Sequence, residues 1–225
     1  MTKKEEALLK RKLKLQEEQK RVYELGEIER HHAQYKFIAG IDEVGRGSVA
    51  GPVVAGAVIL PKDCEILYIN DSKKLSKKKR EAIYDEILKK AIATGLGVVP
   101  PSRIDEINIL QATYEAMRMA IENLSIQPDL LLVDAVQIPD VHIKQVPIVK
   151  GDAKSISIAA ASIFSKVSRD KMMVAYDELY SGYEFSKNCG YGTKAHLEAL
   201  REKGVTPIHR LTFISHIIDN HDERK

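Results

Sequence analysis

Short apolar runs alternate with longer segments in which apolar residues recur at helical spacing, and this alternation begins near Tyr35. The runs that predict strands end in acids or in turn-forming residues, and they are 37–43, 52–60, 95–100, 129–134 and 144–152. The segments that predict helices are 76–88, 102–124, 153–180, 193–204 and 213–218. Strands that alternate with helices predict an α/β domain built on a mixed or partly parallel sheet.

Polar residues mark the expected starts of several of these helices. Ser76 and Thr193 stand at N-cap positions, and Gly204 is placed to end the helix that Thr193 begins. Ser102, with Asp105 three residues later, resembles a capping box and predicts the start of another helix. Helix boundaries are thus predicted from capping chemistry as well as from spacing.

Residues 1–34 differ from the rest of the chain, because they are rich in Lys, Glu, Gln and Leu and contain one glycine and no proline. Their leucines form only a rough apolar stripe: Leu8, Leu9, Leu13 and Leu15. We expect a solvated helix or helical hairpin ahead of a main domain formed by residues 35–225. A charged arm that packs on this domain is favoured over an arm dedicated to nucleic acid.

Composition narrows the class of protein. A chain of 225 residues with 44% hydrophobic and 30% charged residues suits one domain with an appendage and excludes full disorder. It has no run of about 18 apolar residues and no apolar signal segment near its charged N-terminus, so neither a membrane span nor secretion is expected. Cys64 and Cys189 form no disulfide framework or CxxC site, which fits a reducing cytoplasm.

The distribution of charge is more informative than the net charge of +3. Residues 73–80 carry six cations in eight positions, whereas the acids of interest follow apolar runs elsewhere. A cationic patch beside clustered carboxylates suits an enzyme that acts on nucleic acid through bound metal. The same pattern is also compatible with an ordinary surface of mixed charges.

Three predicted strands end in acids, namely Asp42 with Glu43, Asp134, and, after one glycine, Asp152. Carboxylates that converge at one edge of a sheet repel one another unless a cation lies among them. Oxygen ligands without histidine or cysteine favour Mg²⁺ or Mn²⁺. The other interpretation is that Asp42 and Glu43 simply open a turn, and the residues alone leave both open. Asp170 lies 18 residues beyond Asp152, which on a continuous helix is about 27 Å and places it outside such a site.

The segment Gly45-Arg46-Gly47 follows the first acidic pair. Glycines let a backbone approach a ligand closely, exposed N–H groups suit phosphate or sugar oxygens, and arginine adds a fork for phosphate. Adjacent strand residues face opposite sides, so Asp42 and Glu43 reach one site only if the strand ends or bends, as these glycines allow. By itself a Gly-x-Gly turn is a weak signal.

Other catalytic motifs do not occur in the sequence. Neither a P-loop nor a GxSxG nucleophile motif is present, which argues against a kinase or phosphatase of small molecules. His31 and His32 lie in the charged arm, and His196 and His209 are more typical of capping or packing than of metal ligation.

Seven segments together resemble ribonuclease HII, in the order and spacing of that family. They span about residues 35–215, and they are GIDEVGRG (40–47), AGPVVAGAVIL (50–60), NDSKKLSKKKR (70–80), LLVDA (131–135), KGDAKSISIAAASIFSKVSRD (150–170), GYGTKAH (190–196) and TPIHR (206–210). The resemblance implies an α/β fold of the ribonuclease H-like type, a mixed five-stranded sheet flanked by helices. It adds an N-terminal helical extension and a C-terminal helical part.

The resemblance also implies an activity. The implied activity is that of an endoribonuclease that hydrolyses the RNA strand of RNA–DNA hybrids. Such an enzyme also cuts 5′ to single ribonucleotides embedded in duplex DNA, leaving 3′-hydroxyl and 5′-phosphate ends. Four catalytic carboxylates are implied to hold Mn²⁺ or Mg²⁺, with the first bridging two ions: Asp42, Glu43, Asp134 and Asp152. We expect a cytoplasmic monomer that binds these duplexes and no membrane.

Substrate contacts are implied residue by residue. Gly45, Arg46 and Gly47 match the loop that contacts the 2′-hydroxyl side of a ribonucleotide next to DNA. Tyr191 matches the tyrosine that stacks on the sugar of the following deoxynucleotide. Three further residues match basic positions near phosphates: Lys73, Lys74 and Lys166.

Two positions depart from the pattern of the family. Ser48 stands where proline is usual, which frees φ and adds an N–H donor, so a less rigid loop is expected. Ala135 stands where glycine is usual, so a left-handed backbone there is excluded or costly. Neither removes a carboxylate, so activity should survive, and any effect is expected on the fine substrate preference.

Two other classes of protein, ribonuclease HIII and a non-catalytic nucleic-acid-binding module, share part of this pattern. The related ribonuclease HIII usually has a larger N-terminal domain and lysine where Arg46 stands, which the short arm and the Gly-Arg-Gly segment argue against. A catalytically silent nucleic-acid-binding module gains nothing from carboxylates near phosphates, so intact acids argue against that class.

Overall fold

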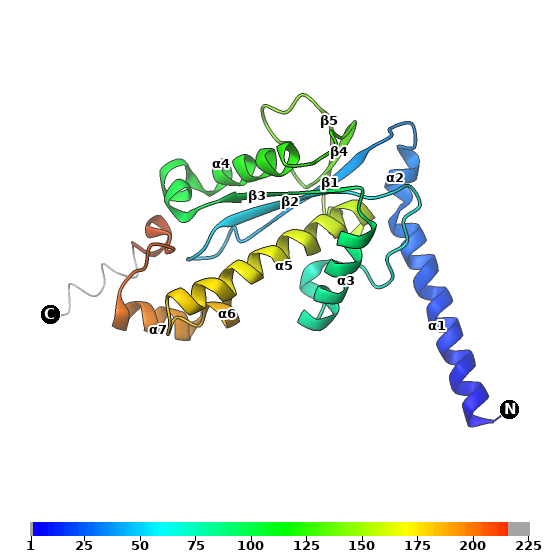
Figure 1. Cartoon of the computed structure of the whole chain (residues 1–225), viewed down its shortest axis with the longest axis horizontal. Coiled ribbons are helices and arrows are strands. Elements are labelled where there is room, and N and C mark those ends of the chain that lie inside the picture. Colours follow the sequence, from blue (N-terminus) through cyan, green and yellow to red (C-terminus); the bar gives the residue numbers. More distant parts are fainter. Residues whose placement is uncertain (1, 216–225) are drawn as a thin grey trace.

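A mixed five-stranded sheet forms the centre of the protein, seen in a computed structural model that describes residues 2–215 (Figure 1). The strands lie in the order β3-β2-β1-β4-β5. They are β1 (Ile38–Val44), β2 (Val53–Ile59), β3 (Ala93–Val99), β4 (Leu130–Asp134) and β5 (Lys144–Ile148). β1, β2 and β3 pair antiparallel, while β1, β4 and β5 pair parallel, so the predicted mixed sheet is confirmed.

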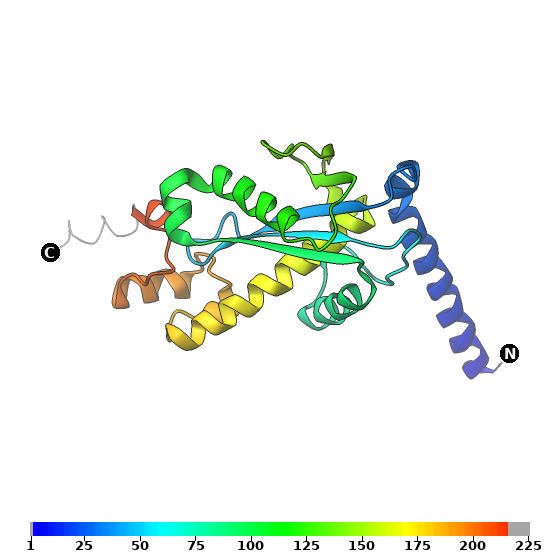
Figure 2. The same ribbon diagram turned by 45° about the horizontal axis from the view of Figure 1, so that its top comes forward.

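Helices cover both faces of this sheet (Figure 2). One face packs on α4 (Pro101–Glu122), whose helical path is broken by a kink at Asn108. The other face packs on α5 (Ile156–Leu179) and α3 (Lys77–Lys90). Because α5 begins with a run of small residues that are fully buried, it lies close against β1 and β2. The shorter helical elements after the first strand are η1 (Ser72–Lys74), η2 (Gly151–Ala153), α6 (Phe185–Asn188) and α7 (Lys194–Lys203).

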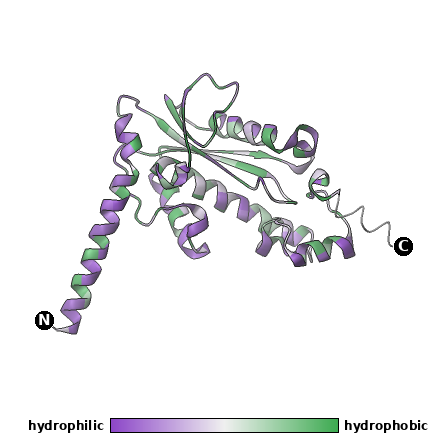
Figure 3. Cartoon of the chain, turned by 180° about the vertical axis from the view of Figure 1, so that it is seen from behind, coloured by the Kyte–Doolittle hydropathy of each residue, from purple (hydrophilic) through white to green (hydrophobic). Residues whose placement is uncertain are grey.

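The N-terminal arm is helical, as predicted, and consists of α1 (Lys3–Leu25) and α2 (Glu27–His31). The far part of α1 projects from the body and is mostly hydrophilic (Figure 3). All four leucines of the expected stripe are exposed: Leu8, Leu9, Leu13 and Leu15. The last turns differ, because Val22 and Leu25 are buried in the same core cluster as residues of α3 and α5. The arm is therefore solvated at its start and packed at its end.

Capping explains where several helices begin. Ser76 accepts from the Lys79 N–H and Thr193 accepts from the His196 N–H, so both predicted caps are confirmed. The capping box at Ser102 is wrong, since α4 starts at Pro101, whose fixed φ and missing N–H suit a first helical position.

Two other boundaries differ from expectation. The long helix starts at Ile156, not at 153, because Ser155 caps it and Asp152 lies in the separate turn η2. Asp152 and Asp170 therefore do not share one continuous helix. Of the final helix expected at 213–218, residues 213–215 are helical and the rest lies outside the described residues. None of the helices described has the length and apolarity that spanning a membrane requires.

Candidate active site

Asp42 and Asp134 lie on neighbouring parallel strands at their carboxyl ends. Ile41 pairs with Val133, so the next residue on each strand is one of these acids. Pairing of β1 with β4 ends there, whereas pairing of β1 with β2 continues to Val44. β1 thus continues past its last pair with β4, and the acids lie at this opening, as expected for a site at the carboxyl edge of the sheet.

Burial makes the first acidic pair electrostatically unfavourable without a cation. The Asp42 side chain is buried, and burial, followed by the negative charges of Glu43 and then Asp134, raises its pKa well above the usual range. The nearby Ser162 hydroxyl and a hydrogen bond from the Glu43 N–H, 2.8 Å from Oδ1, oppose this rise of the pKa. Burial also raises the pKa of Glu43, although Arg46 lies 3.3 Å from its carboxylate and acts against the rise.

The other two acids are joined through the turn at η2. The Gly151 N–H donates to Asp134 Oδ1 at 2.7 Å, which ties the end of β4 to the turn that carries Asp152. Burial, then the charges of Asp71 and Asp134, raises the pKa of Asp152. Asp71, just before η1, is therefore an additional carboxylate at this edge, which the sequence analysis missed. Its only sequence signal was its place beside the lysines of the basic stretch.

The donor set suits a hard divalent cation. Within residues 2–215, no three histidine, cysteine, aspartate or glutamate side chains are already arranged so that they could hold a metal ion. The backbone nevertheless brings the acids to one edge, where the charge of Asp134 helps to raise the pKa of both Asp42 and Glu43. Carboxylate oxygens held together against their repulsion are the ligands that Mg²⁺ and Mn²⁺ prefer.

Two buried arginines donate hydrogen bonds to the main chain of the segment that contains the Gly45–Gly47 loop. Arg210 donates to the carbonyl oxygens of Gly45 at 2.6 Å and of Arg46 at 2.9 Å. Arg169 donates to the carbonyls of Pro52 at 2.8 Å and of Ala50 at 3.2 Å, which follow the loop in the sequence. Burial lowers the pKa of Arg210 to about 9, so it remains protonated at neutral pH. Both arginines lie in segments that resemble the family, KVSRD and TPIHR, but the sequence alone indicates no role for them.

The two glycines of this loop serve different ends. Gly45 has φ +89°, and a Cβ there would lie 2.3 Å from Arg169 Nε, so the fold itself requires glycine. A Cβ at Gly47 would meet nothing within 4 Å. The fold leaves space at Gly47, on an exposed stretch of backbone that a ligand can approach.

Tyr191 lies on a loop that is hydrogen-bonded to the same segment. The Gly190 carbonyl accepts from the N–H groups of Val49 and Ala50 at 2.9 and 3.1 Å. Tyr191 itself is 41% exposed. The structure therefore brings the expected sugar-stacking residue beside the Gly45–Gly47 loop, although the two are more than 140 positions apart in the sequence.

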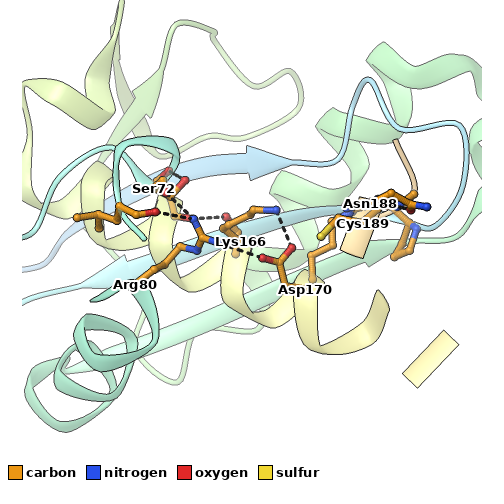
Figure 4. A network of polar contacts seen from close by, with 12 residues as sticks. Ser72, Arg80, Lys166, Asp170, Asn188 and Cys189 are labelled. Carbon is orange, nitrogen blue, oxygen red and sulfur yellow. Dashed lines mark hydrogen bonds and ion pairs between the residues drawn. The ribbon is translucent and has the colours of Figure 1, made fainter. Parts of the chain in front are cut away.

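The three lysines lie in two settings. Lys73 and Lys74 are exposed on η1, beside Asp71. Lys166 is 2.6 Å from Asp170, which also pairs with Arg80 at 3.6 Å (Figure 4). Asp170 thus lies outside the carboxylate group, as expected. This network borders a cavity of about 380 Å³ that Tyr191 also lines.

Both departures from the family pattern carry a local cost. Ser48 is fully buried, and its hydroxyl has no hydrogen-bond partner among residues 2–215. Ala135, directly after Asp134, adopts the left-handed conformation with φ +58°, so the conformation that favours glycine is present despite the Cβ.

Comparisons with known proteins agree with this geometry. A family model described as Ribonuclease HII matches residues 39–216. The ribonuclease HII of Lachnoclostridium phytofermentans is 63% identical over 204 residues, covering 91% of this chain and 80% of that protein. The ribonuclease HII of Enterococcus faecalis is 62% identical over 179 residues, covering 80% of this chain and 70% of that protein. The crystal structure of the ribonuclease H2 from Pyrococcus horikoshii OT3 matches with a TM-score of 0.69 and 25% sequence identity. The match covers 83% of this chain and 99% of that chain.

A mixed sheet of this order with acids at the ends of its central parallel strands defines a metal-dependent nuclease of the ribonuclease H-like fold. More particularly, the chain belongs to the ribonuclease HII family. It is a type 2 ribonuclease H, which cleaves RNA in RNA–DNA hybrids and at ribonucleotides embedded in DNA. The resemblance is confirmed, and the ribonuclease HIII alternative is not supported.

Proposed function

We propose that four carboxylates of this chain perform the hydrolysis by holding Mn²⁺ or Mg²⁺: Asp42, Glu43, Asp134 and Asp152. The observation that carries the proposal is that Asp42 and Asp134 end adjacent parallel strands while Asp42 is buried among like charges. Divalent ions held by these carboxylates would supply Lewis acidity for the attacking water and the leaving 3′ oxygen. Asp42, which Glu43 follows on β1 and which lies across from Asp134 at the end of β4, would be the central member of the group that holds them.

We propose that the two loops select the ribonucleotide. The open space at Gly47 and the fixed carbonyls of Gly45 and Arg46 support an approach of this backbone to the 2′-hydroxyl side of the ribose. The exposed Tyr191 ring is offered to the sugar of the next, deoxy, residue. The 2′-hydroxyl is the chemical feature that distinguishes the two positions.

Phosphate contacts are proposed for the exposed Lys73 and Lys74 and for Lys166. The first two support electrostatic attraction without fixed geometry, since both are exposed. Lys166 is already paired with Asp170, so its contribution depends on a phosphate that competes with that carboxylate.

We also propose a domain organisation, an oligomeric state with its location, and the binding partners of the whole protein. Residues 1–34 form an extension to a catalytic domain of residues 35–225. The protein acts as a monomer in the cytoplasm, where free thiols such as Cys64 and Cys189 persist. It binds RNA–DNA hybrids and DNA that contains ribonucleotides.

The test is incubation with a DNA duplex that holds one ribonucleotide, in Mn²⁺, Mg²⁺ or chelator, followed by mapping of the cut. We expect one cut on the 5′ side of the ribonucleotide, with 3′-hydroxyl and 5′-phosphate ends, and none in chelator. Comparing the two ions establishes which supports cleavage. Cleavage that persists in chelator would refute the metal assignment.

A further inference from the structure

Two histidines outside the carboxylate site contact each other in the C-terminal part of the domain. His196 at the start of α7 and His209 are 0% and 3% exposed. Their Nε2 atoms lie 3.1 Å apart, and both rings pack against Phe185 and Tyr183. A buried pair of nitrogens at this distance holds one proton between them, so each ring must have a defined tautomer.

Hydrogen bonds on the outer nitrogens fix these tautomers. The Thr206 N–H donates to His209 Nδ1 at 2.9 Å, so this nitrogen accepts and His209 carries its proton on Nε2. His196 Nδ1 lies 2.9 Å from the carbonyl oxygen of Tyr191, so this nitrogen donates. His209 Nε2–H then donates to His196 Nε2, and three bonds run in one direction from Thr206 to Tyr191. Burial lowers the pKa of both rings, which keeps them neutral.

The same turn also holds the glycine loop. Arg210 follows His209 directly, and its guanidinium donates to the carbonyls of Gly45 and Arg46. Its own N–H donates to the Val49 carbonyl at 2.9 Å. Two neighbouring residues of one turn therefore hold the two loops that are proposed to face successive sugars of the substrate.

We infer that His196 is a positioning residue that fixes the Tyr191 loop relative to the Gly45–Gly47 loop, with His209 setting its tautomer. This inference rests on the proposed role of Tyr191. Its function is to keep the distance between the two loops matched to one nucleotide step, so that a deoxy sugar is tested directly after a ribose. A small displacement of the tyrosine relaxes that test without touching the carboxylates.

A matched pair of substitutions at one position separates this role from packing. In His196→Asn the amide nitrogen takes the place of Nδ1 and still donates to the Tyr191 carbonyl, but the bond with His209 is lost. In His196→Gln the amide takes the place of Nε2 and still accepts from His209, but the bond to Tyr191 is lost. Each variant loses one buried hydrogen bond, so we expect similar losses of thermal stability.

The readout is a ratio, namely kcat/KM at a single ribonucleotide in DNA divided by kcat/KM within a continuous RNA–DNA hybrid. We expect both His196→Gln and Tyr191→Ala to lower this ratio by at least about tenfold, and His196→Asn to stay within about twofold of wild type. Equal ratios in the two His196 variants would overturn the inference. If Tyr191→Ala leaves the ratio unchanged, the proposed role of Tyr191 fails first.

A second measurement does not depend on cleavage. Long-range ¹⁵N–¹H NMR of the wild-type protein should find His196 protonated on Nδ1 and His209 protonated on Nε2. The opposite tautomers, or a charged ring at neutral pH, would overturn the inference even if every variant failed to fold. Wild-type protein that cleaves neither substrate would instead contradict the proposed function.

Discussion

Asp42 and Asp134 follow a register pair, Ile41 and Val133, on two parallel strands, so the backbone brings two carboxylates together before any ligand binds. The repulsion of like charges is tolerated there because the strands are fixed by the sheet and by the core on both faces. Such a site stores unfavourable electrostatic energy that a cation relieves. This relationship makes metal binding measurable as stability.

Mn²⁺ should raise the thermal stability of the wild-type protein and should not do so in Asp42→Asn. At 100 times the dissociation constant, the ion contributes about 2.7 kcal/mol to the free energy of unfolding. The variant should lose cleavage and keep its binding to an RNA–DNA hybrid. Thermal denaturation with and without Mn²⁺ checks this, with Asp63→Asn, an exposed acid far along the chain, as the control. A full shift in Asp42→Asn would contradict the assignment.

Alanine at the two loop glycines should have opposite effects. Gly45→Ala should destabilise the fold by more than about 1 kcal/mol, because its φ of +89° and the contact with Arg169 both exclude a Cβ. Gly47→Ala should leave the melting temperature unchanged and reduce cleavage at a single ribonucleotide by at least about tenfold. Calorimetry and kinetics on both variants test this contrast. Full activity in Gly47→Ala would argue against close approach of the substrate there.

Ser48→Ala should stabilise the protein by about 1 kcal/mol, because no group in the described part of the chain hydrogen-bonds the buried hydroxyl. Ser165→Ala is the matched control, since that buried hydroxyl donates to the Ser162 carbonyl at 3.1 Å and its removal should destabilise. Urea unfolding measures both. A destabilised Ser48→Ala would mean that the hydroxyl has a partner in solution.

Ala135→Gly should stabilise the protein by roughly 0.5–1 kcal/mol, because alanine pays a steric cost at φ +58° that glycine avoids. Ala195→Gly, in the exposed first turn of α7, should have the opposite sign because glycine weakens helices. Chemical denaturation of the pair gives the comparison. If both variants lose stability, the backbone at Ala135 is not strained.

Stability should fall on mild acidification through the two buried histidines. Burial, and then the charge of His196, lowers the pKa of His209 to about 4, below its ordinary value of about 6.5. The folded state therefore binds fewer protons than the unfolded state between these values. The contribution is complete above about pH 6.5 and is lost as pH falls towards 4, by at most about 1.4 kcal/mol per pH unit for one histidine.

Unfolding by denaturant at pH 7 and at pH 5 measures this loss. His209→Gln removes one titrating ring and keeps an N–H donor facing His196, so its stability should change less between the two pH values. An equal change in the wild type and the variant would assign the acid sensitivity to other groups.

Much of the fold could be predicted because its signals are local. The apolar run 52–60 encodes β2, and Ser76 and Thr193 cap the helices that follow them. The error at Ser102 arose because Pro101 competes for the helix start and wins through its fixed φ. Candidate carboxylates could be named because acids after apolar runs are visible in the sequence and matched a known family.

What only the tertiary structure decided is how the loops are held. Arg169 and Arg210 reach main-chain carbonyls that lie 117 and 165 positions away in the sequence. Every residue carries a carbonyl group, so such a partner leaves no mark on the residue types along the chain. The same holds for the Tyr191 carbonyl that His196 contacts, whereas Asp71 and Asp152 meet through side chains that the chain brings together from distant positions. The sequence by itself determined which chemical groups are available, while the pairing of distant backbone segments determined which of them meet.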